Sequence, residues 1–242
     1  MATLSRVISK WFTEAPHWNG TIIESERIGS RIQKVRIELP EFIIAPFPLG
    51  SYVTAVTWDC VPRCYSTAKS DDRSFTLLVS FSGGGCGARF FRDSPVGTKV
   101  LFYGPFDDFP YRYGTSRPKV FFATSTGIAP FRMMLDEAIK EGVHSTIYIG
   151  SPKESDVALR EEFETLEKQH PKLVKFQPVL SNSDESWKGA RGYVTDYIPK
   201  NAETIRKSDI YICGIPPMTL GVLRALEDID MPKEQIFVQK FG

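Results

Sequence analysis

The sequence predicts a two-domain protein: an N-terminal antiparallel, six-stranded Greek-key β-barrel followed by a C-terminal α/β domain with a doubly wound parallel sheet. Three observations support this fold class. The first half alternates apolar and polar residues in short segments separated by Gly, Pro and Asp. From residue 119 onward, apolar strands alternate with helical patterns. A chain of 242 residues that is 42% hydrophobic is long enough for two cores.

The first half contains six segments that read as strands and only one brief helical stretch, near residues 88–93. Evenly spaced strands with almost no helix between them are typical of a closed or sandwiched barrel. We therefore expect residues 1–114 to form the barrel. The expected strands are residues 21–28, 32–39, 51–58, 63–67, 74–81 and 98–103.

The second half predicts a parallel sheet with helices on both faces, because strand and helix patterns alternate. We expect this domain to span residues 117–242, after a polar Gly- and Pro-containing boundary at 113–118. The expected strands are 119–124, 145–150, 172–180, 209–213 and 235–239, and the clearest helices are 130–140 and 219–228.

The turn at residues 125–131 follows a predicted strand and opens a helix. Pro130 suits the first helical turn, and Phe131, Met134 and Leu135 then fall on one face. Ligands of open parallel sheets bind at the carboxyl ends of the strands. The free N–H groups of this helix start are therefore expected to receive phosphates or a carboxamide of a nucleotide, and Gly127 allows close approach.

One barrel strand carries Arg63, Tyr65 and Ser66 within four residues. A guanidinium, a phenol ring and a small hydroxyl suit a flavin dinucleotide, which needs a cation for its pyrophosphate, a flat face for its ring and a donor near ring nitrogen N5. Ordinary strand packing is the competing interpretation of Tyr65 and Ser66.

The Gly-rich stretch at residues 83–88 formally fits the G-x-G-x-x-A dinucleotide fingerprint, with Asp107 and Asp108 about twenty residues further on. We reject that interpretation, because residues 95–97 stop the following helix early and leave no βαβ unit. A short turn of backbone N–H groups still suits a pyrophosphate. A flexible hairpin is the alternative.

Composition limits the classes of function. A net charge of +1 gives no sign of nucleic-acid binding. No metal is expected, because the four cysteines lack the spacing of zinc or iron–sulfur ligands; they are Cys60, Cys64, Cys86 and Cys213. This cysteine usage indicates a reducing, cytoplasmic location.

No apolar run approaches membrane-spanning length, and no secretory signal is expected. An amphipathic pattern at residues 3–12 favours packing on its own domain, with a partner or membrane surface as the alternative.

Five motifs occur in one order: Arg-Cys-Tyr-Ser at 63–66, Gly-Cys-Gly-Ala at 85–88, Gly-Pro-Phe at 104–106, Thr-Gly-Ile-Ala-Pro at 126–130 and Cys-Gly-Ile-Pro-Pro-Met at 213–218. Over nearly its whole length the chain resembles the ferredoxin–NADP reductase superfamily. The resemblance implies an FAD-carrying barrel and an NAD(P)-binding domain, with electrons passing from NADH or NADPH through flavin to an acceptor.

The resemblance also implies residue roles. Arg63 would hold the FAD pyrophosphate, Tyr65 would stack on the isoalloxazine, and Ser66 would hydrogen-bond near N5. Thr126 and Cys213 would flank the nicotinamide, although a bare Cys213 is more often a small buried apolar residue. The other predicted cofactor-binding residues are Cys64, Ser80, Phe81, Gly85, Cys86, Gly87, Ala88, Gly127, Ile128, Ala129, Pro130, Gly150, Ser181, Gly214, Pro216, Met218 and Phe241.

Some residues depart from the family pattern or leave alternatives open. Ala88 stands where many members have Ser or Thr, so only backbone donors remain in that turn. Phe241 would cover the flavin face where nicotinamide must sit, or is a frayed end. Arg is missing after Ser181, and Lys188 or Arg191 would either reach a 2′-phosphate or stay solvated. The nearby acidic residues Asp184 and Glu185 slightly favour NADH.

The sequence ends at Gly242, where fused reductases continue into an iron–sulfur domain, so the acceptor is expected to be a separate ferredoxin, an oxygenase component, a partner subunit or a small molecule. One alternative is a flavin-carrying electron-transfer subunit resembling the reductase-like subunit of dihydroorotate dehydrogenase, although that family normally adds a cysteine cluster. Another is a non-enzymatic module that kept the fold.

Overall fold

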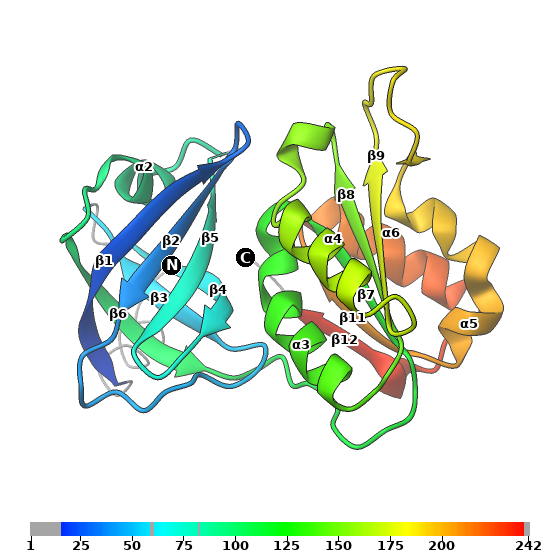
Figure 1. Ribbon diagram of the computed structural model, residues 1–242, viewed down its shortest axis with the longest axis horizontal. Coiled ribbons are helices and arrows are strands. Elements are labelled where there is room, and N and C mark those ends of the chain that lie inside the picture. Colours follow the sequence, from blue (N-terminus) through cyan, green and yellow to red (C-terminus); the bar gives the residue numbers. More distant parts are fainter. Residues whose placement is uncertain (1–15, 59–60, 82, 240–242) are drawn as a thin grey trace, which may run out of the picture.

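The computed structural model describes residues 16–58, 61–81 and 83–239. They form a closed six-stranded antiparallel barrel and a six-stranded parallel sheet with helices on both faces, which confirms the predicted fold class (Figure 1). The predicted amphipathic segment at 3–12, Cys60 and Phe241 lie outside the described residues. No helix in these ranges is both long and apolar enough to cross a membrane.

The barrel closes in the order β1-β2-β5-β4-β3-β6, with every neighbouring pair antiparallel, which is a Greek-key arrangement. Alternate side chains point inward, and the ring of Trp18 stacks on Phe102 with centroids 5.0 Å apart. Helix α2 (Cys86–Asp93) adds Phe90 and Phe91 to the same core. The strands are β1 (His17–Ile28), β2 (Ile32–Glu38), β3 (Tyr52–Val56), β4 (Pro62–Ser70), β5 (Ser74–Ser80) and β6 (Lys99–Phe106).

The parallel sheet has the order β10-β9-β8-β7-β11-β12. Because β7 lies at its centre, the chain moves outward in one direction through β8 and in the other through β11, so the strand order reverses between β7 and β11. The strands are β7 (Lys119–Thr124), β8 (Ser145–Ser151), β9 (Val174–Leu180), β10 (Ala190–Arg191), β11 (Asp209–Cys213) and β12 (Ile236–Gln239).

The two faces of the sheet are covered by different helices (Figure 1). Phe121 packs with α3 and α4, whereas its neighbour Phe122 packs on the opposite face with α5 and α6. This alternation confirms the double winding. The helices are α3 (Ala129–Lys140), α4 (Arg160–Gln169), α5 (Ala202–Arg206) and α6 (Pro216–Glu227).

The sequence did not predict α4, α5 or β10. Phe163 is the only buried side chain of α4, so that helix lacks a clear apolar stripe. Strand β10 has two residues, and α5 has five. The expected boundary at residues 113–118 falls between β6 and β7, and the limits 1–114 and 117–242 stay predictions.

The domains pack directly against each other. Helix α3 lies along β4, and the apolar cluster beneath α3 includes Ile32, Ala68 and Leu78 from the barrel. A charged cluster borders this contact. The carboxylate of Glu162 on α4 faces the amines of Lys69 and Lys34 at 2.7 and 3.3 Å.

The side chain of Arg132 on α3 completes the charged cluster, with its Nε 3.3 Å from Glu162 Oε2. Burial raises the pKa of Glu162, but the hydrogen bonds and charges of Lys69 and Lys34 outweigh it and hold that pKa below its usual value. A carboxyl whose pKa falls on folding stabilises the folded state fully above its unfolded pKa, about 4.3, and loses this contribution as pH falls through the folded pKa.

We therefore expect Glu162→Gln to lower the free energy of unfolding by about 1 to 2 kcal/mol at neutral pH. The difference from wild type should shrink as the pH is lowered from about 5 to about 3. Urea unfolding at a series of pH values measures it. The matched control is Glu161→Gln, an exposed neighbour on the same helix; equal pH dependence in both variants would contradict this assignment.

Candidate functional site

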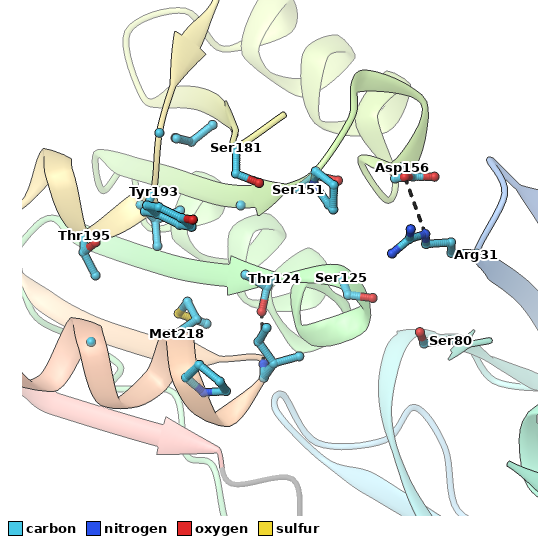
Figure 2. A pocket seen from close by; sticks show the side chains of 18 of the residues that line it. Arg31, Ser80, Thr124, Ser125, Ser151, Asp156, Ser181, Tyr193, Thr195 and Met218 are labelled. Carbon is cyan, nitrogen blue, oxygen red and sulfur yellow. Dashed lines mark hydrogen bonds and ion pairs between the residues drawn. The ribbon is translucent and has the colours of Figure 1, made fainter. Parts of the chain in front are cut away.

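A cavity of about 530 Å³ lies at the carboxyl ends of the central parallel strands and is bordered on one side by the barrel (Figure 2). Thr124 and Ser125 line it from the end of β7, and Ser151 from β8. The barrel contributes its β1–β2 turn and the end of β5. The predicted residues Ser80, Gly150, Ser181 and Met218 all line this cavity, together with Tyr193 and Thr195, which the sequence did not assign to it.

The cavity floor is built by the turns that follow the paired strands β7 and β11. A Cβ on Gly127 would lie 2.1 Å from the carbonyl oxygen of Cys213, and one on Gly214 would lie 2.3 Å from Thr124 Oγ1. The Thr124 hydroxyl accepts a hydrogen bond from the Ile215 backbone N–H at 3.0 Å. Both predicted turns therefore interlock, and their glycines are required for this close contact.

The side chain that faces the cavity from the first turn belongs to Ser125, which has a left-handed φ of 52°. The predicted residue Thr126 follows it in the same 3₁₀ turn and is half-buried. Ile128 and Ala129 are buried in the apolar core, and Pro130 is the second residue of α3, which begins at Ala129. Their predicted contacts with cofactor stay predictions.

A buried polar bridge joins the two domains beside this floor. Oε1 of Gln239, the last described residue of β12, accepts from Ser66 Oγ at 2.6 Å and from Cys213 Sγ at 3.5 Å. Its Nε2 donates to the carbonyl of Gly50 at 3.2 Å. Burial raises the pKa of the Cys213 thiol, so the thiol stays protonated and donates. The predicted residues Ser66 and Cys213 thus share one partner.

Gln239 was not predicted from the sequence. The available signal is a polar residue at the carboxyl end of an otherwise apolar strand, but only the fold shows which groups it meets. The predicted residue Pro216 is exposed at the start of α6 and does not line the cavity. The next residue, Pro217, lines it.

The second predicted region is a cradle on the barrel, at the amino end of α2. A Cβ on Gly87 would lie 2.6 Å from Tyr65 Oη and 2.7 Å from Arg63 Cδ, so these side chains pack directly on the helix backbone. Arg63 Nη1 donates to Thr57 Oγ1 at 3.1 Å and to the Val61 carbonyl at 2.9 Å.

Open space precedes this helix, because a Cβ on Gly84 or Gly85 would meet nothing within 4 Å. A guanidinium beside a helix amino end, with a bare Gly-rich turn in front of it, fits the diphosphate of the flavin dinucleotide expected from the sequence. Cys64 is exposed, while Cys86 and Ala88 are half-buried in α2; both cysteines carry free thiols.

The close packing at Gly87 gives a test of the cradle. Gly87→Ala should displace Arg63 and Tyr65 and lower the FAD content of the purified protein at least severalfold, because the added methyl has no room. Flavin absorbance per protein measures it. Asp93→Ala, an exposed change at the opposite end of the same helix, is the control. Wild-type flavin content in Gly87→Ala would mean that FAD does not use this cradle.

Comparison with known proteins places the chain among flavin-dependent reductases and their relatives only by similarity of sequence and fold. Residues 121–223 match the oxidoreductase NAD-binding domain family. The chain is 29% identical to ferredoxin–NADP reductase B of Sorangium cellulosum, with 82% of each chain covered. It is 28% identical to the anthranilate 1,2-dioxygenase electron transfer component of Acinetobacter baylyi, over 74% of this chain and 53% of that protein.

Solved structures show the same fold. A cytochrome P450 reductase from Amycolatopsis superposes with a TM-score of 0.84 at 24% identity, covering 94% of this chain and 71% of that one. A ferredoxin–NADP⁺ reductase from Plasmodium falciparum superposes with a TM-score of 0.79 at 18% identity, covering 92% of this chain and 95% of that one.

Proposed function

The chain belongs to the ferredoxin–NADP reductase superfamily, and from this premise we propose that it is an FAD-dependent reductase that takes electrons from NADH and delivers them to a separate acceptor. The observation that carries the proposal is the bridge at Gln239. It brings Ser66, from the predicted flavin strand, and Cys213, from the predicted nicotinamide turn, onto one amide oxygen. This contact between the two predicted binding regions supports the proposal.

FAD, when bound, supplies the redox chemistry, since a flavin accepts a hydride from a dihydronicotinamide and releases electrons singly or in pairs. The chain's own residues bind and orient. Arg63 and the amino end of α2 would hold the diphosphate, and Tyr65 would offer its ring as a stacking face. Ser66, whose hydroxyl donates to Gln239 Oε1, would place its oxygen near the ring, and Cys213, whose thiol donates to the same oxygen, would border the nicotinamide.

The cavity favours NADH over NADPH. Arg31 is the sole Lys or Arg among its described lining residues. Arg191 follows Ser181 along the chain, but its guanidinium donates to the backbone carbonyls of Asp184 and Trp187 at 2.9 and 2.8 Å. These bonds hold Arg191 within its own loop, so the Ser181–Tyr193 end lacks the cation that a 2′-phosphate needs.

Anaerobic titration of the purified protein tests the function. We expect a yellow protein whose flavin is bleached by NADH, with a kcat/KM for NADH at least about tenfold above that for NADPH, as expected for one missing charge-assisted contact. A colourless protein that does not take up FAD would contradict the proposal. A flavin that neither nucleotide bleaches would favour the alternative, a flavin-carrying subunit of a larger complex.

Replacing Cys213 tests the nicotinamide side of the site. Cys213→Ala should slow flavin reduction by NADH about tenfold to a hundredfold while FAD content stays unchanged, because nicotinamide placement is disturbed and flavin binding is not. Cys213→Ser keeps a donor for Gln239 and should lie closer to wild type. Stopped-flow absorbance measures both variants; equal rates in all three proteins would reduce Cys213 to a packing residue.

The acceptor is proposed to be a separate electron-carrying protein, since the relatives above are named for ferredoxin and for a dioxygenase component. A cytoplasmic location rests on cysteine usage alone and stays a prediction, as does the cover of the flavin face by Phe241. We also propose that the domain limits 1–114 and 117–242 separate the FAD-binding and NAD-binding units.

A further inference from the structure

The β1–β2 turn of the barrel, residues 29–31, reaches across to the sheet domain and is fixed there. Gly29 has a φ of +56°, and a Cβ on it would lie 2.1 Å from the carbonyl oxygen of Ser155. Ser30 Oγ donates to Asp156 Oδ1 at 2.7 Å. Close backbone contact and a short hydrogen bond therefore hold this turn against the loop that follows β8.

Arg31 and Asp156 both line the cavity, where they are the sole cation and the sole anion among the described lining residues. Figure 2 shows them facing each other across its barrel side. Their ion pair is long, with Arg31 Nε 3.8 Å from Asp156 Oδ2. The two side chains differ in exposure, at 53% for Arg31 and 6% for Asp156. Asp156 is thus anchored, and the Arg31 guanidinium is loosely held.

We propose that Arg31 leaves Asp156 to bind the diphosphate of the incoming dinucleotide, and that Asp156 is a built-in competitor that limits the affinity. This inference rests on the proposed function, which places a nicotinamide dinucleotide in this cavity. A guanidinium binds a phosphate through two parallel hydrogen bonds, whereas a single contact at 3.8 Å is weak and partly screened by water. The diphosphate therefore outcompetes the carboxylate.

The other polar groups of the cavity make Arg31 the natural partner of the diphosphate. They are mainly neutral hydroxyls, such as those of Thr124, Ser151 and Ser181. A dinucleotide brings two negative charges, and no other cation lines the described part of the cavity to meet them. When the oxidised nucleotide leaves, Asp156 recaptures Arg31. Asp156 thereby favours release as well as weakening binding.

Calorimetric titration of the FAD-loaded protein with ADP and with adenosine tests this proposal, because only ADP carries the diphosphate. Arg31→Gln should weaken ADP binding about tenfold to a hundredfold and leave adenosine binding unchanged. Asp156→Asn, which keeps an oxygen for Ser30, should tighten ADP binding about twofold to fivefold. In the double variant Arg31→Gln/Asp156→Asn, the gain should disappear. Lys99→Gln removes a charge from the far side of the barrel and is the control.

Each result decides the matter. Unchanged ADP affinity in Arg31→Gln, or no gain in Asp156→Asn, overturns the proposal. If Asp156→Asn tightens ADP binding equally with and without Arg31, the Asp156 carboxylate simply repels the diphosphate. That result overturns the proposed competition for Arg31. If Arg31→Gln does not fold, Arg31→Lys is measured instead. Its ADP affinity must lie between that of wild type and that expected for Arg31→Gln. A wild-type protein that NADH reduces but that binds no ADP overturns this inference alone, whereas one that NADH does not reduce overturns the proposed function.

Discussion

The amide of Gln239 holds the contact on which the rest of the site depends. The flavin motif lies on the barrel and the nicotinamide turn on the sheet, so neither domain forms the site alone. Within this one buried side chain, Oε1 accepts hydrogen bonds from Ser66 Oγ and Cys213 Sγ, while Nε2 donates one to the Gly50 carbonyl. Removing this amide would leave buried polar groups without partners, which costs more than the hydrogen bonds themselves contribute. The relative placement of the domains is therefore specified at the point where chemistry needs it.

Helix α3 connects this central contact to the rest of the interface. Its amino end continues from the interlocked turn that carries Ser125, and its side packs on β4, the strand of Arg63 and Ser66. A shift of the nucleotide turn relative to the flavin strand would thus require α3 to move against a packed apolar surface. Ion pairs at Glu162 and Asp156 surround that surface. Partly exposed pairs contribute little energy, but they select one orientation among several apolar packings.

The sequence predicted what local patterns determine. Strand positions in both domains agree with the structure within a few residues, because alternation and apolar runs report burial directly. Helix α4 escaped prediction because Phe163 is its only buried residue. Gln239 and Arg31 escaped for another reason. Their partners lie far away in the sequence, since Gln239 and Ser66 are 173 positions apart, so only the assembled fold shows what they meet.

The two kinds of interdomain contact respond differently to acid. The bridge at Gln239 contains an amide, a hydroxyl and a thiol whose pKa burial has raised, so none of its groups changes charge as pH falls below neutrality. The cluster around Glu162 contains a carboxylate with a lowered pKa, which becomes protonated only in acid. A glutamate in place of Gln239 would accept from the same two donors but leave the Gly50 carbonyl without one. The amide therefore satisfies three partners at once, and acid loosens the rim of the interface before its centre.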